Sequence, residues 1–376
     1  MASDSLEGRK TGTEGEQKAA RYIVEQFSTI GLAPAGTEGF YQAYEVTPSQ
    51  NPHEVPTMGG GGSLTIKSNN VIGLIDNPGE EIVIIGAHYD HLGYGGVSSL
   101  FRGDSAQVHN GADDNASGVA VMIQLAEKLK ASNLEKDVLF MAFSGEEEGL
   151  WGSNYFSKNA TIDLKKATAM INLDMVGRLD EQRGLAIHGV GTSPVWPDMI
   201  NQANNDSLQL IFRESGVGPS DHTSFYLQDL PVLHFFTGQH ADYHKPGDDA
   251  DKLNYEGMVK IASMIEKIVI QLDGHDKLAF TKTKDESTET PRFTVSLGVV
   301  PDYLYSGVGM RIDGVSEGKP AQAAGLQKGD IVIKLGNNEV MDMMGYMKAL
   351  STFEKGNETT VTVNRNGAEI TLPIKF

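Results

Sequence analysis

Four apolar runs of strand length constrain the fold of this chain more than any other feature. The runs are residues 82–87, 138–143, 169–173 and 232–236. Runs without alternation are typical of strands that are covered on both faces. Apolar residues recur at helical spacing between and after them, at 116–130, about 153–159, 194–205 and 255–272. This alternation predicts an α/β domain in three layers, with a mostly parallel twisted sheet and helices on both faces.

Polar side chains that suit metal binding follow the ends of these runs. His88 and Asp90 follow the first run, Glu146 and Glu147 the second, and Asp174 the third, while the fourth leads on to His244. In open parallel sheets, ligands bind beyond the carboxyl ends of the strands. We therefore expect these side chains to meet at one edge of the sheet.

Two adjacent acids, Asp113 and Asp114, stand where the helical pattern at 116–130 begins. Either could simply cap the helix, because Asp accepts hydrogen bonds from the free N–H groups of a first turn. One acid suffices for that role, so the second needs another explanation. Each of these residues is ordinary by itself, but their joint occurrence at strand ends and a helix start favours a functional site.

The 376 residues include no cysteine, so a metal would be held by His, Asp and Glu alone. Five residues suit two zinc ions, with one carboxylate shared between them: His88, Asp113, Glu147, Asp174 and His244. Asp113 is our choice for the shared ligand because a helix start fixes its position. We expect Asp90 to accept the ring N–H of His88, and Glu146 to serve as the general base. Manganese or cobalt would also accept such ligands.

Several motifs, taken in order, resemble the di-zinc aminopeptidase family, which includes secreted bacterial aminopeptidases and vacuolar aminopeptidase Y and is related to glutaminyl cyclases. The similarity covers roughly residues 5–273. Its motifs are Leu6-Glu-Gly-Arg-Lys-Thr-Gly, His88-Tyr-Asp90, Gly111-Ala-Asp113-Asp114-Asn-Ala-Ser-Gly118, Glu146-Glu147-Glu-Gly-Leu150, Asn172-Leu-Asp174-Met and Tyr243-His244.

The resemblance implies one zinc on His88 and Asp174 and another on Glu147 and His244, with Asp113 bridging and Glu146 as the base. It also implies a cis peptide between Asp113 and Asp114, and hydrolysis of the first peptide bond of a peptide by a metal-bridged water.

Asp114, Tyr243 and His222 would then lie around the metals or line the substrate pocket, although Asp221 next to His222 could simply cap a helix over 222–228. Two alternatives remain open at this stage. One is a glutaminyl-cyclase-like acyltransferase with a single zinc, and the other is a peptide-binding protein whose peptidase domain is inactive. Asp114 and the full ligand set argue against the first, and the full ligand set together with Glu146 argues against the second.

The chain divides at a polar stretch. We expect a zinc-peptidase domain over 1–275, with a loop at 45–63, then a linker over 276–291 and a small β-rich domain over 292–376. The last domain resembles a bacterial PDZ domain in Ser296-Leu-Gly-Val299 and Lys319-Pro-Ala-Gln-Ala-Ala-Gly325. Backbone N–H groups at Leu297, Gly298 and Val299 could bind the terminal carboxylate of a C-terminal peptide ligand.

A net charge of −19 argues against nucleic acid as a partner. No apolar run approaches the roughly 20 residues that cross a membrane. The expected substrates are the amino termini of peptides or proteins. The expected location is secreted or periplasmic, with a leader missing from this chain, and a cytoplasmic location is the alternative.

Overall fold

A computed structural model describes residues 1–47, 57–58, 65–96, 98–103, 105–180, 182–283, 295–302, 305, 307–316 and 318–376. The chain forms two compact units. The larger contains Met1–Thr237 and Asp242–Thr283, and the smaller contains the C-terminal residues. Each unit has its own hydrophobic core.

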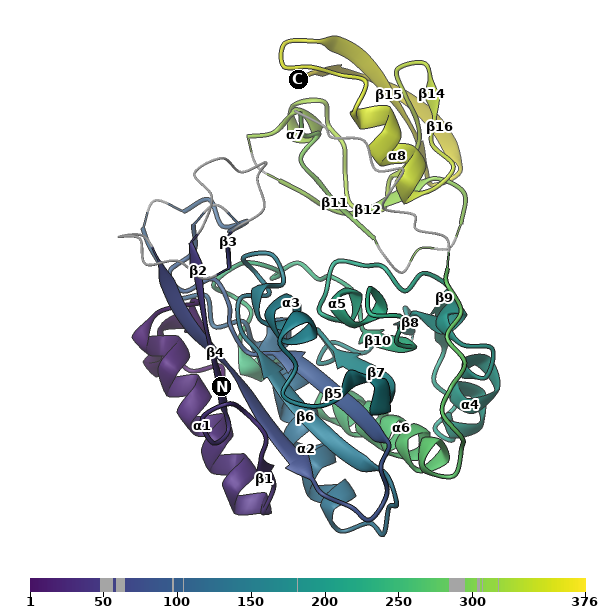
Figure 1. The fold of residues 1–376 in the computed structure, drawn as a ribbon. Coiled ribbons are helices and arrows are strands. Elements are labelled where there is room, and N and C mark those ends of the chain that lie inside the picture. The colour runs from purple at the N-terminus through teal and green to yellow at the C-terminus, as the bar shows by residue number, and fades with distance from the viewer. Residues whose placement is uncertain are drawn as a thin grey trace. The chain divides into compact units, whose positions relative to one another are not determined.

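The large unit is built on one ten-stranded sheet (Figure 1). Its main strands run in the order β3-β2-β4-β6-β5-β7-β10-β8-β9, and β1 pairs with β4. The bounds are β1 Ala33–Pro34, β2 Tyr41–Thr47, β3 Thr57–Met58, β4 Ile66–Ile75, β5 Ile82–His88, β6 Asp137–Phe143, β7 Ala167–Leu173, β8 Leu185–His188, β9 Leu210–Arg213 and β10 Val232–Phe236. The centre, β6-β5-β7-β10, is parallel. Its carboxyl ends therefore share one edge.

Helices cover both faces of this sheet, which confirms the predicted α/β architecture (Figure 1). Residues of α1, α2, α4 and α6 pack into the larger core on one face, and α3 and α5 contribute to the core on the other. Their bounds are α1 Glu14–Ile30, α2 Gly118–Lys130, α3 Trp151–Lys158, α4 Trp196–Ala203, α5 His222–Tyr226 and α6 Tyr255–Asp273. Among the residues described, no helix is both long and apolar enough to span a membrane.

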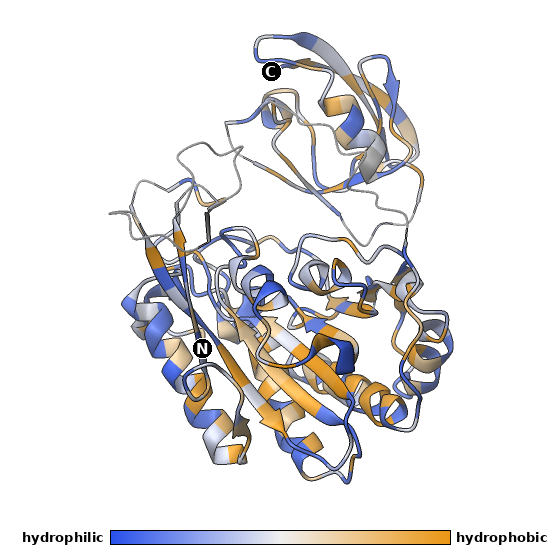
Figure 2. Ribbon diagram, viewed as in Figure 1, coloured by the Kyte–Doolittle hydropathy of each residue, from blue (hydrophilic) through white to orange (hydrophobic). Residues whose placement is uncertain are grey.

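The central strands coincide with the apolar runs because they are buried along their whole length. Every residue of β5 and of β7 is buried, and Figure 2 shows the apolar colouring of the central strands. Part of the loop expected over 45–63 is strand instead, because residues 45–47 belong to β2 and 57–58 form β3. Of the rest of that range, 48–56 and 59–63 lie outside the described residues.

The large unit continues past residue 275, where we expected the linker to begin. Leu278 is buried in the larger core, and the backbone N–H of Thr281 donates to the carbonyl of Thr192 at 2.8 Å. The backbone N–H of Thr283 donates to the Tyr226 hydroxyl at 3.0 Å. Residues 278–283 therefore pack against the large unit. The expected linker residues 284–291 lie outside the described part of the chain.

The C-terminal unit is an antiparallel β-domain with two short helices, α7 Pro320–Ala323 and α8 Met343–Leu350. Its strands run in the order β11-β12-β13-β15-β16, with β14 beside β13. They are β11 Val299–Pro301, β12 Met310–Val315, β13 Ile331–Leu335, β14 Asn338–Glu339, β15 Glu358–Arg365 and β16 Ala368–Lys375. Asn366 and Gly367 join β15 to β16 with positive φ at both residues, as a type I′ turn requires.

Candidate metal centre

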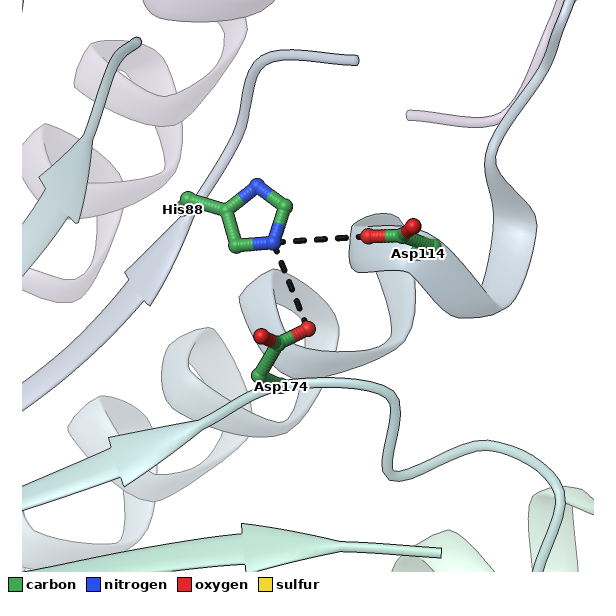
Figure 3. Close-up of side chains that lie close together, drawn as sticks. All are labelled: His88, Asp114 and Asp174. Atoms are coloured by element: carbon green, nitrogen blue, oxygen red, sulfur yellow. Dashed lines mark hydrogen bonds and ion pairs between the residues drawn. The ribbon is translucent and has the colours of Figure 1, made fainter. Parts of the chain in front are cut away.

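The parallel strand ends and one helix start bring together two histidines and three acids. His88 is the last residue of β5, Glu147 follows β6, and Asp174 follows β7. Asp114 lies in the turn Ala112–Ser117 that precedes α2. Figure 3 shows His88, Asp114 and Asp174 converging from these elements.

The Asp114 carboxylate lies between the two histidines. Its Oδ1 is 3.4 Å from Nε2 of His88, and its Oδ2 is 3.2 Å from Nε2 of His244. Asp174 Oδ1 lies 3.3 Å from His88 Nε2, and Glu147 Oε2 lies 3.3 Å from His244 Nε2. The result is two groups of donor atoms that share one carboxylate.

These spacings fit a pair of tetrahedral cations. Two ligand atoms that each bind zinc at about 2.0–2.1 Å lie about 3.3–3.4 Å apart on the edge of a tetrahedron. The four donor pairs lie 3.2–3.4 Å apart. His88, Asp114 and Asp174 thus form one group able to hold an ion. His244 lies at the same spacing from Asp114 and from Glu147.

The charges of the site also favour cations. Burial alone would lower the pKa of His88, but the carboxylates of Asp174 and Glu146 raise that pKa well above its ordinary value. Burial would likewise lower the pKa of His244, whereas the carboxylates of Glu147 and Asp114 raise it to about 11. Without cations, protons on these imidazoles balance the buried acids. Divalent ions could take the place of those protons.

The structure corrects our assignment of the shared carboxylate, because Asp114, not Asp113, occupies the place between the histidines. Asp113 Oδ1 instead accepts the backbone N–H of Gly177 at 2.6 Å and the Ser117 hydroxyl at 3.0 Å. Asp113 therefore connects the start of α2 to the segment after β7. The cis peptide is displaced in the same way, since it joins Asp114 to Asn115 rather than Asp113 to Asp114.

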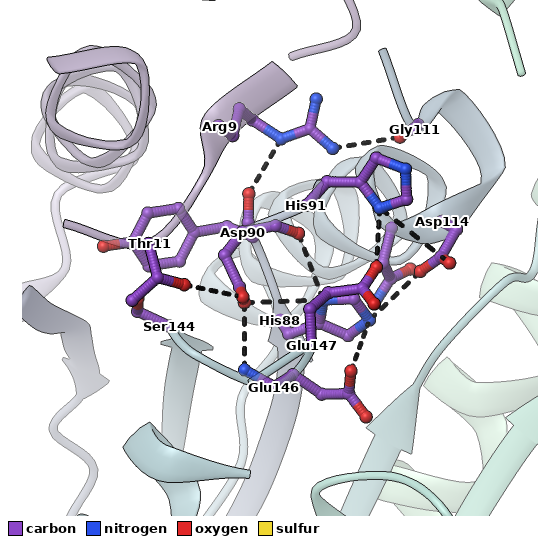
Figure 4. A network of polar contacts seen from close by, with 12 residues as sticks. Arg9, Thr11, His88, Asp90, His91, Gly111, Asp114, Ser144, Glu146 and Glu147 are labelled. Carbon is purple, nitrogen blue, oxygen red and sulfur yellow. Dashed lines mark hydrogen bonds and ion pairs between the residues drawn. The ribbon is translucent and has the colours of Figure 1, made fainter. Parts of the chain in front are cut away.

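Glu146 lies next to the donor groups, and Asp90 holds its backbone. Oε2 of Glu146 is 3.9 Å from Nε2 of His88. Burial raises the pKa of the Glu146 carboxyl well above its ordinary value. The backbone N–H of Glu146 donates to Oδ1 of Asp90 at 3.2 Å, and the Thr11 hydroxyl donates to Oδ2 at 2.9 Å (Figure 4).

The expected contact between Asp90 and His88 involves chiefly the backbone. Nδ1 of His88 lies 3.3 Å from the carbonyl oxygen of Asp90 and 3.6 Å from its carboxylate. The carbonyl therefore fixes the ring, which leaves Nε2 to face Asp114 and Asp174.

The two expected pocket residues have different surroundings. Tyr243 stacks on His244, with ring centroids 3.9 Å apart. His222 is buried and stacks on His234, with centroids 4.5 Å apart and planes 2° from parallel. Neither ring nitrogen of His222 has a hydrogen-bond partner among the described residues.

Comparison with known families identifies the large unit. The model of peptidase family M28 matches residues 70–269, which is more than half of the 376 residues. The chain belongs to peptidase family M28. A PDZ-domain model matches residues 278–376, so the M28 domain is followed by a PDZ domain.

Curated relatives of this M28 chain include a named aminopeptidase. It is 28% identical over 219 residues to aminopeptidase YwaD of Bacillus subtilis, covering 54% of this chain and 44% of that protein. It is 33% identical over 213 residues to the alkaline phosphatase isozyme conversion protein of Escherichia coli, covering 56% of this chain and 57% of that protein. The chain thus spans about half the length of these relatives.

Solved structures share the M28 fold. A zinc aminopeptidase from Bacillus subtilis aligns with a TM-score of 0.55 at 19% identity, covering 71% of this chain and 91% of that one. A zinc-dependent exopeptidase from Parabacteroides distasonis aligns with a TM-score of 0.58 at 15% identity, covering 72% and 94%.

The M28 fold places further residues at the site that the sequence reasoning did not assign. Asp248 is fully buried, and its Oδ2 accepts the backbone N–H groups of Asp113 and Asp114 at 2.9 and 3.1 Å. Its Oδ1 lies 3.3 Å from a guanidinium nitrogen of Arg178. Because Asp248 follows His244 closely in the chain, it links two of the segments that carry donor atoms.

Arg9 is a second such residue, and it too is fully buried. Its guanidinium donates to the backbone carbonyls of Tyr89, Asn110 and Gly111 at 2.8, 2.6 and 3.0 Å, and Figure 4 shows the contact with Gly111. It therefore ties the segment after β5 to the segment before Asp114. The signal for Arg9 was present in the Leu6-Glu-Gly-Arg motif, but nothing in the sequence showed which carbonyls it reaches.

Proposed function

We propose that this chain is a metal-dependent aminopeptidase that uses two divalent cations, zinc in the first instance, to remove residues from the amino termini of peptides. The observation that carries the proposal is the Asp114 carboxylate, with one oxygen facing His88 and the other facing His244. Membership of family M28 supports it.

The proposed ligands fall into two sets. His88 and Asp174 would hold one ion, Glu147 and His244 would hold the other, and Asp114 would be shared. Bound there, the cations would polarise the scissile carbonyl and lower the pKa of a water molecule. Neighbouring residues hold the proposed ligands in place. Asp248 accepts the backbone N–H of Asp114, and the carbonyl of Ser98 accepts from Nδ1 of His244 at 2.9 Å.

Glu146 is the proposed general base. Its carboxylate lies 3.9 Å from His88 of the first donor set, and Asp90 fixes its backbone. It would take a proton from the attacking water and return the proton to the leaving amine. An elevated pKa suits this exchange, because the same group must accept and then donate a proton near neutral pH.

Hydrolysis of matched substrates tests the activity. Leucine p-nitroanilide has a free amino group, and N-acetyl-leucine p-nitroanilide differs only in that this group is blocked. We expect the zinc-loaded chain to hydrolyse the first and not the second, and a chelator to abolish the reaction. Equal rates on both substrates would contradict an aminopeptidase.

We propose that the C-terminal unit binds the carboxyl end of a peptide. Among the described strands, β11 pairs only with β12, so its other edge is available to an added strand. Leu297 and Gly298 precede it, and Gly298 has φ of 78°. A Cβ at Gly298 would lie 2.1 Å from Cβ of Lys319, so the loop passes close to a basic residue.

Two peptides of one sequence test this binding, one with a free C-terminal carboxylate and one with an amidated end. Fluorescence anisotropy should detect binding of the free acid and a clear loss on amidation, because the amide removes the charge. The same comparison can be made for a library of such peptide pairs. If no free acid in the library binds more tightly than its amide, this part of the proposal is wrong.

We also propose that the enzyme works outside the cytoplasm. The resemblance to secreted aminopeptidases supports this location. Fractionation of the native host, with an antibody to the chain, tests it, and detection in the cytosolic fraction alone would contradict it.

A further inference from the structure

A third histidine, His91, lies against the proposed ligand Glu147. Its imidazole is buried, and its Nδ1 is 2.7 Å from Oε1 of Glu147 (Figure 4). The ring meets that of His244 edge-on, with centroids 5.8 Å apart. His91, Asp114 and Glu147 also form a group whose atoms are close enough to hold an ion, so direct binding of a cation is the alternative role.

The two oxygens of Glu147 have different neighbours. Oε2 is 3.3 Å from His244 Nε2, which matches the edge of a metal tetrahedron. Oε1 is 2.7 Å from His91 Nδ1, which is a hydrogen-bond distance for a charged acceptor and is shorter than a ligand–ligand edge. His91 therefore contacts the oxygen that does not face the proposed ion.

The other ring nitrogen of His91 indicates its tautomer. Nε2 is buried and has no hydrogen-bond partner among the described residues. If Nδ1 bound a cation, the proton would sit on Nε2 and would be a buried donor without an acceptor, which is costly. With the proton on Nδ1, the hydrogen bond to Glu147 is made and Nε2 is left as an unpaired acceptor, which folded proteins tolerate better than an unpaired N–H donor.

The second terminal carboxylate of the site has the same arrangement. Asp174 Oδ1 lies 3.3 Å from His88 Nε2, at ligand spacing. Its Oδ2 accepts the Ser220 hydroxyl at 2.8 Å. In each carboxylate one oxygen faces the proposed ion and the other accepts a hydrogen bond from a buried side chain.

The backbone leaves room for His91 only because residue 111 is glycine. A Cβ at Gly111 would lie 2.5 Å from Cγ and Cδ2 of the His91 ring, and φ of Gly111 is 51°. The ring is thus packed against the segment that leads to Asp114.

We propose that His91 is a positioning residue that donates its Nδ1–H to Oε1 of Glu147 and so presents Oε2 to the second metal ion. The inference rests on the proposed two-ion function. It implies that loss of the donor lowers the affinity for one ion and leaves the affinity for the other nearly unchanged. It also implies that Ser220 has the matching role for the ion at His88 and Asp174.

Zinc titration of the metal-free full chain, by calorimetry with a competing chelator, tests this. His91→Ala should lower the affinity for one of the two ions by about 10–100-fold, which is the usual effect of removing a hydrogen-bond partner of a ligand. His91→Asn keeps an N–H close to the position of Nδ1 and should recover most of that loss. Ser220→Ala should lower the affinity for the other ion.

His188→Asn is the matched control, because His188 is a histidine at the end of β8 that contacts His234 rather than Glu147. Circular dichroism of each metal-free variant shows whether it is folded. If His91→Asn is folded and loses as much zinc affinity as His91→Ala, then His91 binds the ion directly and the inference is wrong. Unchanged affinity in His91→Ala would also overturn it. A wild-type chain that binds fewer than two ions would overturn the proposed function and the inference with it.

Discussion

At the scale of single residues, the site depends on which of two adjacent acids faces the histidines. Asp113 and Asp114 have the same side chain and similar burial, so composition and spacing do not separate them. The structure separates them by backbone direction. Asp113 points to the N–H of Gly177, and Asp114 points between His88 and His244.

Glu146 provides the first prediction. Glu146→Gln keeps the size of the side chain but removes its ability to accept a proton, so kcat for leucine p-nitroanilide should fall by about 10²–10⁴-fold. Bound zinc, measured by mass spectrometry, should stay at the wild-type level because Glu146 is not a proposed ligand. A variant that keeps its rate would show that another group is the base.

Most of the proposed centre was predictable residue by residue. His88, Glu147, Asp174 and His244 stand out because they follow buried strands, and the structure does bring them together. The error at Asp113 arose because a helix start indicates a rigid position but not which of its residues points inward. His91 was overlooked because candidate ligands were chosen where they follow a strand, and His91 follows the same strand as His88.

At the scale of elements, the site depends on contacts between loops. Asp248 connects the His244 segment to the Asp114 segment through two backbone N–H groups. Asp248→Asn should lower zinc affinity by about 10–100-fold in a chelator competition assay, because an amide holds those groups less strongly than a carboxylate.

Asp242→Asn is the matched control for Asp248→Asn. Asp242 also contacts Arg178, at 3.3 Å, but it is not the acceptor of the Asp113 and Asp114 N–H groups. Equal losses of affinity in the two variants would mean that Arg178, rather than the backbone contact, carries the effect.

The segment after α6 gives a stability prediction. Leu278 is 6% exposed and packs into the core, so Leu278→Ala should reduce the free energy of unfolding by about 2–5 kcal/mol. Leu227 is 64% exposed, and Leu227→Ala should change it by less than about 0.5 kcal/mol. Urea unfolding of both variants measures the difference, and similar small effects would contradict the packing of residues 278–283.

Elements were predictable where burial is complete. The central strands appear as apolar runs because neighbours cover both faces. The short strands β8 and β9 were not predicted, since four residues give little periodicity and β9 is half-buried throughout. The last three residues of β2 were assigned to a loop because Pro48, Pro52 and Pro56 and then Gly59 to Gly62 follow them in the sequence.

At the scale of the whole molecule, the raised pKa values predict how stability depends on pH. An imidazole whose pKa is higher in the folded than in the unfolded chain stabilises the fold. This contribution is complete at pH values below the pKa of the unfolded chain, which is about 6.5 for histidine. For His244 that contribution is lost as the pH rises toward about 11. Glu16, whose burial raises its pKa to about 7, adds to the loss because its ionised form is disfavoured in the fold.

The metal-free protein should therefore have a Tm that falls as the pH rises from about 6 to about 9. Zinc should bind more tightly over the same range, since fewer protons compete for the imidazoles. Differential scanning fluorimetry with chelator and with zinc measures both effects. A metal-free Tm that rises with pH would contradict the charge balance described for the site.

The proposed function requires that the M28 domain hold two cations that share Asp114. Metal analysis of the zinc-loaded, dialysed chain tests it most directly when wild type, Asp114→Asn and Asp113→Asn are measured together. We predict two zinc ions per wild-type chain, fewer than two in Asp114→Asn and two in Asp113→Asn. One ion in the wild type, or two ions retained in Asp114→Asn, would show that Asp114 does not join a pair of cations.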